Sequence, residues 1–281
     1  MKVQRAEHAQ KQHTHVSPNY ASYFNRYQGR KSLKRREADN GPFQAKGDAS
    51  PNAFHPDFPQ PSPSSFPLSS SILLSSTYLG PVQLYAHLYA ASQATEDRHE
   101  HFIKQTYRNR CYIATPTGPQ PLTIPVVRDG ASHTPTRDVR ISDHGNWRHL
   151  HWTALASAYE SSPYFEYYAD DFRPLYERPF TFLVDFNEAL LDTVLSLLSL
   201  ERPIHQTEAY IAPTALPPST LDLRTVISPK QSLETDPAFH PVPYYQVFAQ
   251  RTGFLPNLSI ADLLFNLGPE SRMVLRASLT R

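Results

Sequence analysis

Three cations lie close together in the segment KQTYRNRCYIA: Lys104, Arg108 and Arg110. On an extended backbone they would point to one side, because side chains alternate between the two faces of a strand. Guanidinium groups form paired, charge-assisted hydrogen bonds with phosphate or carboxylate. The pattern therefore predicts an anion-binding site, to which Tyr107 and Asn109 would add a hydroxyl and an amide. The alternative is a solvated strand end.

A second candidate site is the segment TYLGP, which stands between a predicted strand and a predicted helix. Open α/β sheets bind ligands beside such turns, and the free backbone N–H groups at a helix start attract anions. Tyr78 offers a hydroxyl, and Gly80 permits a tight turn or the close approach of a ligand. We therefore include Tyr78 and Gly80 in the predicted substrate site. The alternative is an ordinary connection.

Two residues of the segment NWRHLHWTALASAY are candidates for acid–base chemistry. His151 and Tyr159 lie eight residues apart, so they share one face of a predicted helix. Imidazole is the side chain that most often acts as a general base. We therefore predict that His151 and Tyr159 are catalytic. The alternative for His151 is a buried core histidine whose hydrogen bonds are satisfied.

The sequence gives little support for metal or thiol chemistry. The HEH segment, His99 to His101, has a spacing that is common by chance in a chain with 13 His. The single Cys111 excludes a disulfide framework and a multi-thiolate zinc site. Because Cys111 stands within a predicted strand, we expect a small buried apolar side chain. Phosphate loops, nucleophile elbows and HExxH motifs are absent, so we expect no metal and no cofactor.

The segment EYYADDFRP combines aromatic rings with carboxylates and an arginine. Such a composition can recognise sugar hydroxyls or an amine through hydrogen bonds and aromatic faces. The alternative is an exposed polar helix end.

The elements that must position these side chains follow from hydrophobic periodicity. Strands are predicted at residues 72–79, on both sides of the turn PTGP as an antiparallel pair, and at residues 138–142. Three helices are predicted to begin after Pro81, after the capping residue Asn146, and at Pro179. A fourth is predicted to begin after Ser259, with Asp262 three residues on, and to end at Gly268 and Pro269. Residues 201–243 are rich in proline, and we expect them to form a long loop on the surface. The fold class is therefore α/β or α+β, with a mixed sheet flanked by helices.

Composition divides the chain into a tail and one globular domain. Residues 1–70 carry ten Lys/Arg against five Asp/Glu, include the run GRKSLKRRE, and are dense in proline. We expect residues 1–70 to form a disordered tail and residues 71–281 to form the domain. The remainder of the chain is slightly acidic, which argues against nucleic-acid binding, since that binding requires a basic face.

Membrane and export signals are not recognised in the sequence. The longest apolar segment, ALLDTVLSLLSL, contains Asp192 and is shorter than the roughly 20 residues that span a bilayer. The polar amino terminus never leads into an apolar run typical of a signal peptide. Together with the single cysteine, this predicts a cytoplasmic protein without a transmembrane segment.

Several ordered motifs resemble the WbqC-like family in its Bacteroidetes form. They are YLGPVQLYAHL, KQTYRNRCYI, LTIPV with RDVRI, WRHLHWTALASAYESSPYFEYYADDF, and PVPYYQVF leading to GFLPNLSIADLLFNLGP. The resemblance runs from about residue 72 to 275, with one departure at Gly80, where members often have proline. It implies a role in the synthesis of O-antigen and other surface polysaccharides.

Two functions are therefore expected. The first, which the resemblance implies, is a cytoplasmic transferase that moves glycine or another small acyl group onto a nucleotide sugar or glycan. The alternative is a non-catalytic scaffold of a polysaccharide-assembly complex. The scaffold would contact partner proteins through the aromatic segments SPYFEYY and PVPYYQVF.

Overall fold

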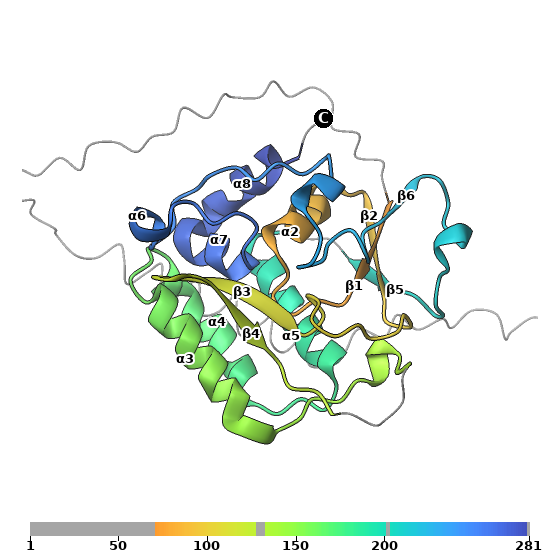
Figure 1. Ribbon diagram of the computed structural model, residues 1–281, viewed down its shortest axis with the longest axis horizontal. Coiled ribbons are helices and arrows are strands. Elements are labelled where there is room, and N and C mark those ends of the chain that lie inside the picture. The colour runs from red at the N-terminus through yellow and green to blue at the C-terminus, as the bar shows by residue number, and fades with distance from the viewer. Residues whose placement is uncertain (1–70, 128–132, 201–202, 280–281) are drawn as a thin grey trace, which may run out of the picture. The chain divides into compact units, whose positions relative to one another are not determined.

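The structure, a computed structural model, describes residues 71–127, 133–200 and 203–279 (Figure 1). The tail predicted over residues 1–70 lies outside the described residues.

A four-stranded parallel sheet, in the order β5-β2-β1-β6, carries the α/β fold. Its strands are β1 (Ser71–Ser75), β2 (Gln93–Asp97), β5 (Ile204–Gln206) and β6 (Thr220–Asp222). The apolar run ILL of β1 is buried on both faces, as expected for a central parallel strand. Because β2 and β6 flank β1, the strand order reverses at β1, and the carboxyl ends of β1 and β6 form the switch point where such sheets bind ligands.

A separate antiparallel hairpin joins β3 (Arg110–Thr115) to β4 (Gly118–Thr123). The predicted pair is therefore confirmed, and Cys111 on β3 is fully buried as expected. The strand predicted at residues 138–142 is wrong. That segment forms only isolated bridges, because it meets short stretches of chain rather than a neighbouring strand.

The helices predicted from periodicity are present. They are α2 (Val82–Ala90), α3 (Trp147–Tyr159), α5 (Leu183–Leu197) and α7 (Ile260–Leu267). The other helices of the described residues are α4 (Phe165–Glu177), α6 (Ala249–Thr252) and α8 (Ser271–Ala277). Short 3₁₀ turns are η1 (Thr136–Asp138), η2 (His144–Asn146), η3 (Pro213–Ala215), η4 (Leu233–Thr235) and η5 (Gly268–Glu270).

The helices pack on both sides of the hairpin (Figure 1). Helices α2, α7 and α8 contact one another, and α3 packs on α4. Both α3 and α7 also contact β3, and α7 contacts α3 and α4 directly, so the two groups of helices meet beside the hairpin. The fold class with a sheet flanked by helices is confirmed, although the antiparallel pair forms its own two-stranded sheet.

Two predicted helix starts need correction. Asn146 adopts a left-handed backbone conformation with φ of 47° and makes no side-chain capping bond to α3. Helix α5 begins at Leu183 rather than at Pro179. By contrast, the Ser259 hydroxyl does accept a hydrogen bond from the Ala261 N–H, and α7 ends at Leu267, just before Gly268, whose φ is +55°.

Asp262 anchors α7 to two other segments. Its carboxylate is fully buried and accepts hydrogen bonds from the hydroxyls of Tyr159 (2.8 Å) and Tyr244 (2.7 Å), and from the Gln246 amide (3.0 Å). These donors come from α3 and from the segment PVPYYQVF. Burial raises the pKa of Asp262 to about 6, although the three hydrogen bonds oppose that change.

The pKa of Asp262 predicts a pH-dependent stability. Because the folded-state pKa lies above the unfolded value of 3.8, the protonated form stabilises the fold below pH 4, and this contribution is lost as the pH rises through about 6. The full effect is on the order of 3 kcal/mol. In urea denaturation, the free energy of unfolding of the native chain minus that of Asp262→Asn should be more positive at pH 4.5 than at pH 7. The same difference at both pH values would contradict a raised pKa of Asp262 in the folded chain.

Candidate functional site

The Tyr78 hydroxyl is the centre of a buried polar cluster. It lies 2.9 Å from His151 Nδ1 and 2.9 Å from the Tyr176 hydroxyl. Tyr78 belongs to the turn after β1, His151 to α3 and Tyr176 to α4, and all three are buried. The sequence interpretation missed Tyr176. Helical spacing could have identified Tyr176, because it shares a face of α4 with Phe165 and Phe172, which are buried.

His151 is a neutral base within this cluster. Burial lowers the pKa of His151 to about 4, although a hydrogen bond with the Thr123 backbone opposes that change. Burial raises the pKa of Tyr78 and of Tyr176, so both phenols keep their protons. A neutral imidazole carries one N–H, which suits the Thr123 carbonyl, and this leaves Nδ1 to accept a hydrogen bond from the Tyr78 hydroxyl.

Tyr159 belongs to a different network. His151 and Tyr159 both face the core from α3, as predicted. The Tyr159 hydroxyl, however, donates to Asp262 and accepts from the Ala114 N–H at 3.1 Å. Eight residues along a helix separate the two side chains by roughly 12 Å. The structure therefore does not bring His151 and Tyr159 into one hydrogen-bonded site.

Gly80 is required by packing. A Cβ atom at this position would lie 2.7 Å from Leu84 Cδ2 and 2.7 Å from Thr77 Oγ1. The preceding Leu79 has a φ of 41°, which is unusual for a residue with a side chain. The turn is therefore compact, and the side chains of Leu84 and Thr77 occupy the space beside Gly80 where a Cβ would point.

The backbone donors at the start of α2 are already used. The Val82 N–H donates to the Leu258 carbonyl and the Gln83 N–H to the Asn257 side chain, both at 2.9 Å. The predicted role of this turn as an anion site depended on these groups being free. The segment before α7 takes the place that the anion was expected to occupy.

The cations of the opening segment do not share one face. Residues 104–109 form turns, and β3 begins only at Arg110. Arg108 is 3% exposed, and its Nε and Nη2 donate to Glu100 Oε1 and Oε2 at 2.9 and 2.6 Å. The expectation of an extended run is therefore wrong, and the anion held by Arg108 is the carboxylate of Glu100.

Tyr107 and Asn109 support the turn from the inside. The Tyr107 carbonyl accepts from the Tyr78 N–H at 2.8 Å. The Asn109 amide donates to the Ile124 carbonyl at 2.9 Å. Both side chains are buried. Lys104 is exposed and forms no ion pair with a described residue.

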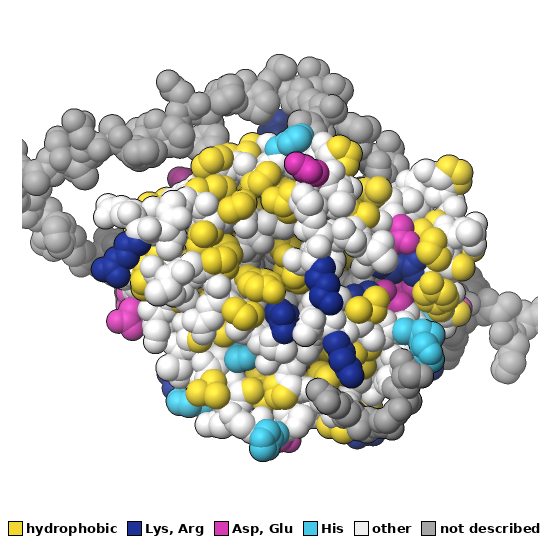
Figure 2. Space-filling view, in the orientation of Figure 1, with side chains coloured by type: hydrophobic (Ala, Val, Ile, Leu, Met, Phe, Trp, Pro, Cys, Tyr) yellow, Lys and Arg dark blue, Asp and Glu magenta, His cyan; other side chains and the backbone are white. Residues whose placement is uncertain are grey.

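Thr123 connects the surface to the buried cluster. Its hydroxyl accepts from Arg110 Nε at 2.9 Å on the exposed side of the hairpin, whereas its backbone meets His151 below. Figure 2 shows Lys and Arg side chains near the middle of this face, close to the hairpin, while most acidic side chains lie nearer the rim. Of the predicted residues, the structure thus brings together Arg110, His151 and Tyr78.

The carboxyl ends of the parallel strands carry paired charges. Arg224, just after β6, donates to Asp97 at the end of β2 and to Asp222, both at 2.6 Å. It also donates to the Ile211 carbonyl at 2.8 Å. Arg224 and Asp97 are buried. The sequence interpretation missed this pair, which fastens the segment before β6 to the sheet.

The described residues contain neither a metal-binding cluster nor a membrane-spanning helix. No group of three or more His, Cys, Asp or Glu side chains in residues 71–127, 133–200 and 203–279 is placed to hold a metal ion. None of the described helices has both the length and the hydrophobicity needed to cross a bilayer.

The Arg108–Glu100 pair predicts a large effect of one substitution. Arg108→Ala leaves a buried carboxylate unpaired, which typically costs about 3–5 kcal/mol. Arg110→Ala is the matched control, because Arg110 bonds an exposed hydroxyl and should cost less than about 1 kcal/mol. Denaturant unfolding measures both. The double variant Arg108→Met with Glu100→Leu removes both charges, so it should be more stable than Arg108→Ala. Equal stabilities of Arg108→Ala and Arg110→Ala would contradict the pairing.

Comparison with known proteins gives one family and one relative. The model of the WbqC-like protein family matches residues 77–238, which include Tyr78, Arg110 and His151. The uncharacterized protein Rv1507c from Mycobacterium tuberculosis (strain ATCC 25618 / H37Rv) is 30% identical over 200 residues, covering 62% of this chain and 84% of that protein. No solved structure matches the chain.

Proposed function

The chain belongs to the WbqC-like protein family, and on that premise we propose that it transfers a small acyl group, such as glycine, to a sugar during surface-polysaccharide synthesis. The acceptor is a nucleotide sugar or a glycan. The reaction takes place in the cytoplasm, in keeping with a chain that has a single cysteine.

The arrangement around Thr123 supports this proposal. An acyl transfer needs a cation for a phosphate or carboxylate of the substrate, and a base for the proton of the attacking hydroxyl. Arg110 supplies the cation on the outer side of the hairpin, and Lys104 in the preceding turn adds a second. His151 supplies the neutral base directly beneath.

The proposed step is nucleophilic substitution at the acyl carbon. The sugar hydroxyl attacks the carbonyl carbon of an activated acyl donor, so a new carbon–oxygen bond forms and its proton passes to His151. The bond to the leaving group breaks, and the leaving group departs with the electron pair. The attacking hydroxyl gives its proton to the Tyr78 hydroxyl, which passes its own proton to His151 Nδ1, the ring nitrogen that carries none.

Substrate access requires β4 to move, because the backbone of Thr123 covers His151. Strand β4 pairs only with β3 and contains Pro119 and Pro121, which donate no backbone hydrogen bonds. Strand β4 is therefore held by fewer backbone hydrogen bonds than a strand without proline, which lowers the cost of opening the hairpin.

A scaffold remains the second candidate because two tyrosines are unusually exposed. Tyr167 and Tyr245 expose 70% and 56% of their surface. They belong to the segments SPYFEYY and PVPYYQVF. In the first segment, the Tyr164 ring stacks on Tyr168 and packs against Gly268, which holds this aromatic surface in place. A surface of this kind suits a partner protein of polysaccharide assembly.

Ligand-induced stabilisation of the full chain tests the anion-binding half of the proposal. The ligands are nucleotide sugars, nucleotides, acyl carriers and amino acids. A ligand at a hundred times its Kd adds about 2.7 kcal/mol, which raises the Tm by a few degrees. Arg110→Ala should lose the shift, and Arg251→Ala, an exposed arginine on α6, should keep it.

Mass spectrometry of the acceptor tests the catalytic half. His151→Gln should keep the ligand shift and lose acyl transfer by about 10²-fold or more, since general base catalysis contributes that much. Acyl transfer at the native rate in His151→Gln would show that His151 is not the general base. No shift with any ligand class, together with a partner whose binding Tyr167→Ala abolishes, would favour the scaffold.

A further inference from the structure

The indole of Trp147 is a buried hydrogen-bond donor without an acceptor. Trp147 is 4% exposed, and its Nε1 has no hydrogen-bond partner among the described residues. An indole carries one N–H and no acceptor, so only an oxygen or another atom with a lone pair can satisfy it. The large majority of buried polar groups in native proteins are paired, and an unpaired one is therefore a mark of strain, of a bound molecule or of a catalytic role.

Trp147 packs directly against the base of the proposed reaction. It is the first residue of α3, and His151 follows four residues later on the same face. The two rings meet at an angle of 70° with their centroids 5.2 Å apart. Trp147 also contacts Phe186 at 5.5 Å, and Phe186 stacks on Tyr78 at 5.8 Å. The indole therefore belongs to the same aromatic enclosure as Tyr78 and His151.

The other donors of this enclosure are already engaged. Because the Tyr78 hydroxyl donates its one proton to His151 Nδ1, the Tyr176 hydroxyl donates to Tyr78. The second nitrogen of His151 meets the Thr123 backbone. Among these described side chains, the indole N–H is thus the donor that can take a new acceptor.

Arg148 adds a positive charge beside the indole. Its guanidinium carbon lies 5.1 Å from the centre of the Trp147 ring, and its Nη2 donates to Asp143 Oδ1 at 2.6 Å. Arg148 Nε is a second buried donor without an acceptor among the described residues. Two adjacent donors of this kind, one of them charged, favour an oxygen that develops negative charge.

We infer that Trp147 Nε1 donates a hydrogen bond to the carbonyl oxygen of the acyl group during transfer. This inference rests on the proposed function and assigns a further catalytic residue to the same site. As the sugar hydroxyl attacks, the electron pair of the C=O bond moves onto that oxygen, which becomes an oxyanion. The pair returns when the leaving group departs. The indole keeps its proton throughout and stabilises the charge.

Packing prepares the indole for this role. His151 and Phe186 contact its ring from α3 and α5, and a donor that is already held in place needs no reorganisation when charge develops. Access follows the route of the proposed reaction, because the opening of β4 uncovers His151 and the indole is the ring beside it.

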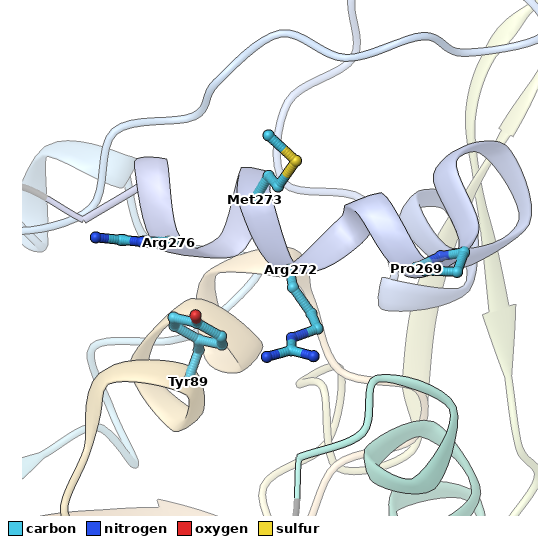
Figure 3. A pocket seen from close by; sticks show the side chains of 5 residues that line it. All are labelled: Tyr89, Pro269, Arg272, Met273 and Arg276. Atoms are coloured by element: carbon cyan, nitrogen blue, oxygen red, sulfur yellow. The ribbon is translucent and has the colours of Figure 1, made fainter. Parts of the chain in front are cut away.

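A shallow hollow elsewhere on the molecule does not contribute to this site. It has a volume of about 240 Å³ and lies between α2 and α8 (Figure 3). It is lined by Tyr89, Pro269, Arg272, Met273 and Arg276. Tyr89 stands near the last residue of α2, whereas Tyr78 precedes the first, and nine helical residues span roughly 13 Å. The hollow is therefore at the opposite end of α2 from the Tyr78 turn.

Replacing the indole N–H by sulfur tests the inference without changing the shape of the ring. The chain has two tryptophans, so Trp152→Phe leaves Trp147 as the single one. Growth on β-(3-benzothienyl)alanine then puts sulfur in place of its N–H, and the reference is the same variant with ordinary tryptophan. The kcat of acyl transfer should fall about 10²-fold or more with little change in KM, because the oxyanion contact forms only in the transition state.

NMR of the native chain gives a second readout that requires no turnover. In ¹H–¹⁵N spectra, Trp147→Phe identifies the indole signal by its loss. Saturating glycinamide, which carries an acyl carbonyl, should move this signal downfield. Ethanolamine is the matched probe, because it has the amine but no carbonyl, and it should leave the signal unchanged.

Each outcome decides the inference. A kcat equal to that of the reference, or an indole signal that glycinamide leaves unchanged, overturns it. If the benzothienyl chain has a lower Tm than the reference, the glycinamide shift decides. A shift that depends on the carbonyl, in a chain that transfers no acyl group, would contradict the proposed function alone. Transfer that survives the loss of the N–H would contradict the role of Trp147 alone.

Discussion

A hydroxyl or carboxylate buried without a partner costs about 1–3 kcal/mol, and this constraint governs the arrangement of the domain. The Tyr78 hydroxyl meets it by joining α3 and α4 to the turn after β1. The Asp262 carboxylate meets it by joining α7 to α3 and to the segment PVPYYQVF. Helix α3 contributes to both networks through His151 and Tyr159. The polar groups of the core thus determine how the helices are placed around the hairpin, while the apolar side chains supply the bulk of the burial.

The same constraint distinguishes two kinds of arginine: those that the fold pairs with a carboxylate and those that it does not. Arg108 and Arg224 are buried, so each must have a carboxylate partner, and the chain provides Glu100 and Asp97. Arg110 and Arg272 lie nearer the solvent and form no ion pair with a described carboxylate. Cations of this second kind can bind an external anion without first losing an internal bond. The proposed anion site at the hairpin therefore depends on an arginine that the folded core does not require.

The sequence predicts the elements that are marked by neighbouring residues, such as caps and turns. It does not predict elements that depend on contacts with residues far away in the sequence. Helix α7 and the β3–β4 hairpin follow from capping and turn residues. Strand β2, QATED, has no strand pattern, because its Glu96 and Asp97 become buried only through Arg98 and through Arg224, which lies 127 positions away. Helix α4 begins in a segment rich in acids and includes Pro174, so its buried stripe was hidden. For the candidate site, Tyr78 and His151 could be identified from residue type and position, but their contact could not.

The central claim is that His151 is a neutral base whose Nδ1 accepts a hydrogen bond from the Tyr78 hydroxyl. ¹⁵N NMR of the imidazole in the full chain, followed from pH 4 to 8, measures this state directly, and Tyr78→Phe assigns the Nδ1 signal. The account predicts one neutral tautomer with unprotonated Nδ1 from pH 5 to 8, and protonation only near pH 4. An imidazolium at pH 6, or an Nδ1 signal that Tyr78→Phe leaves unchanged, would contradict it.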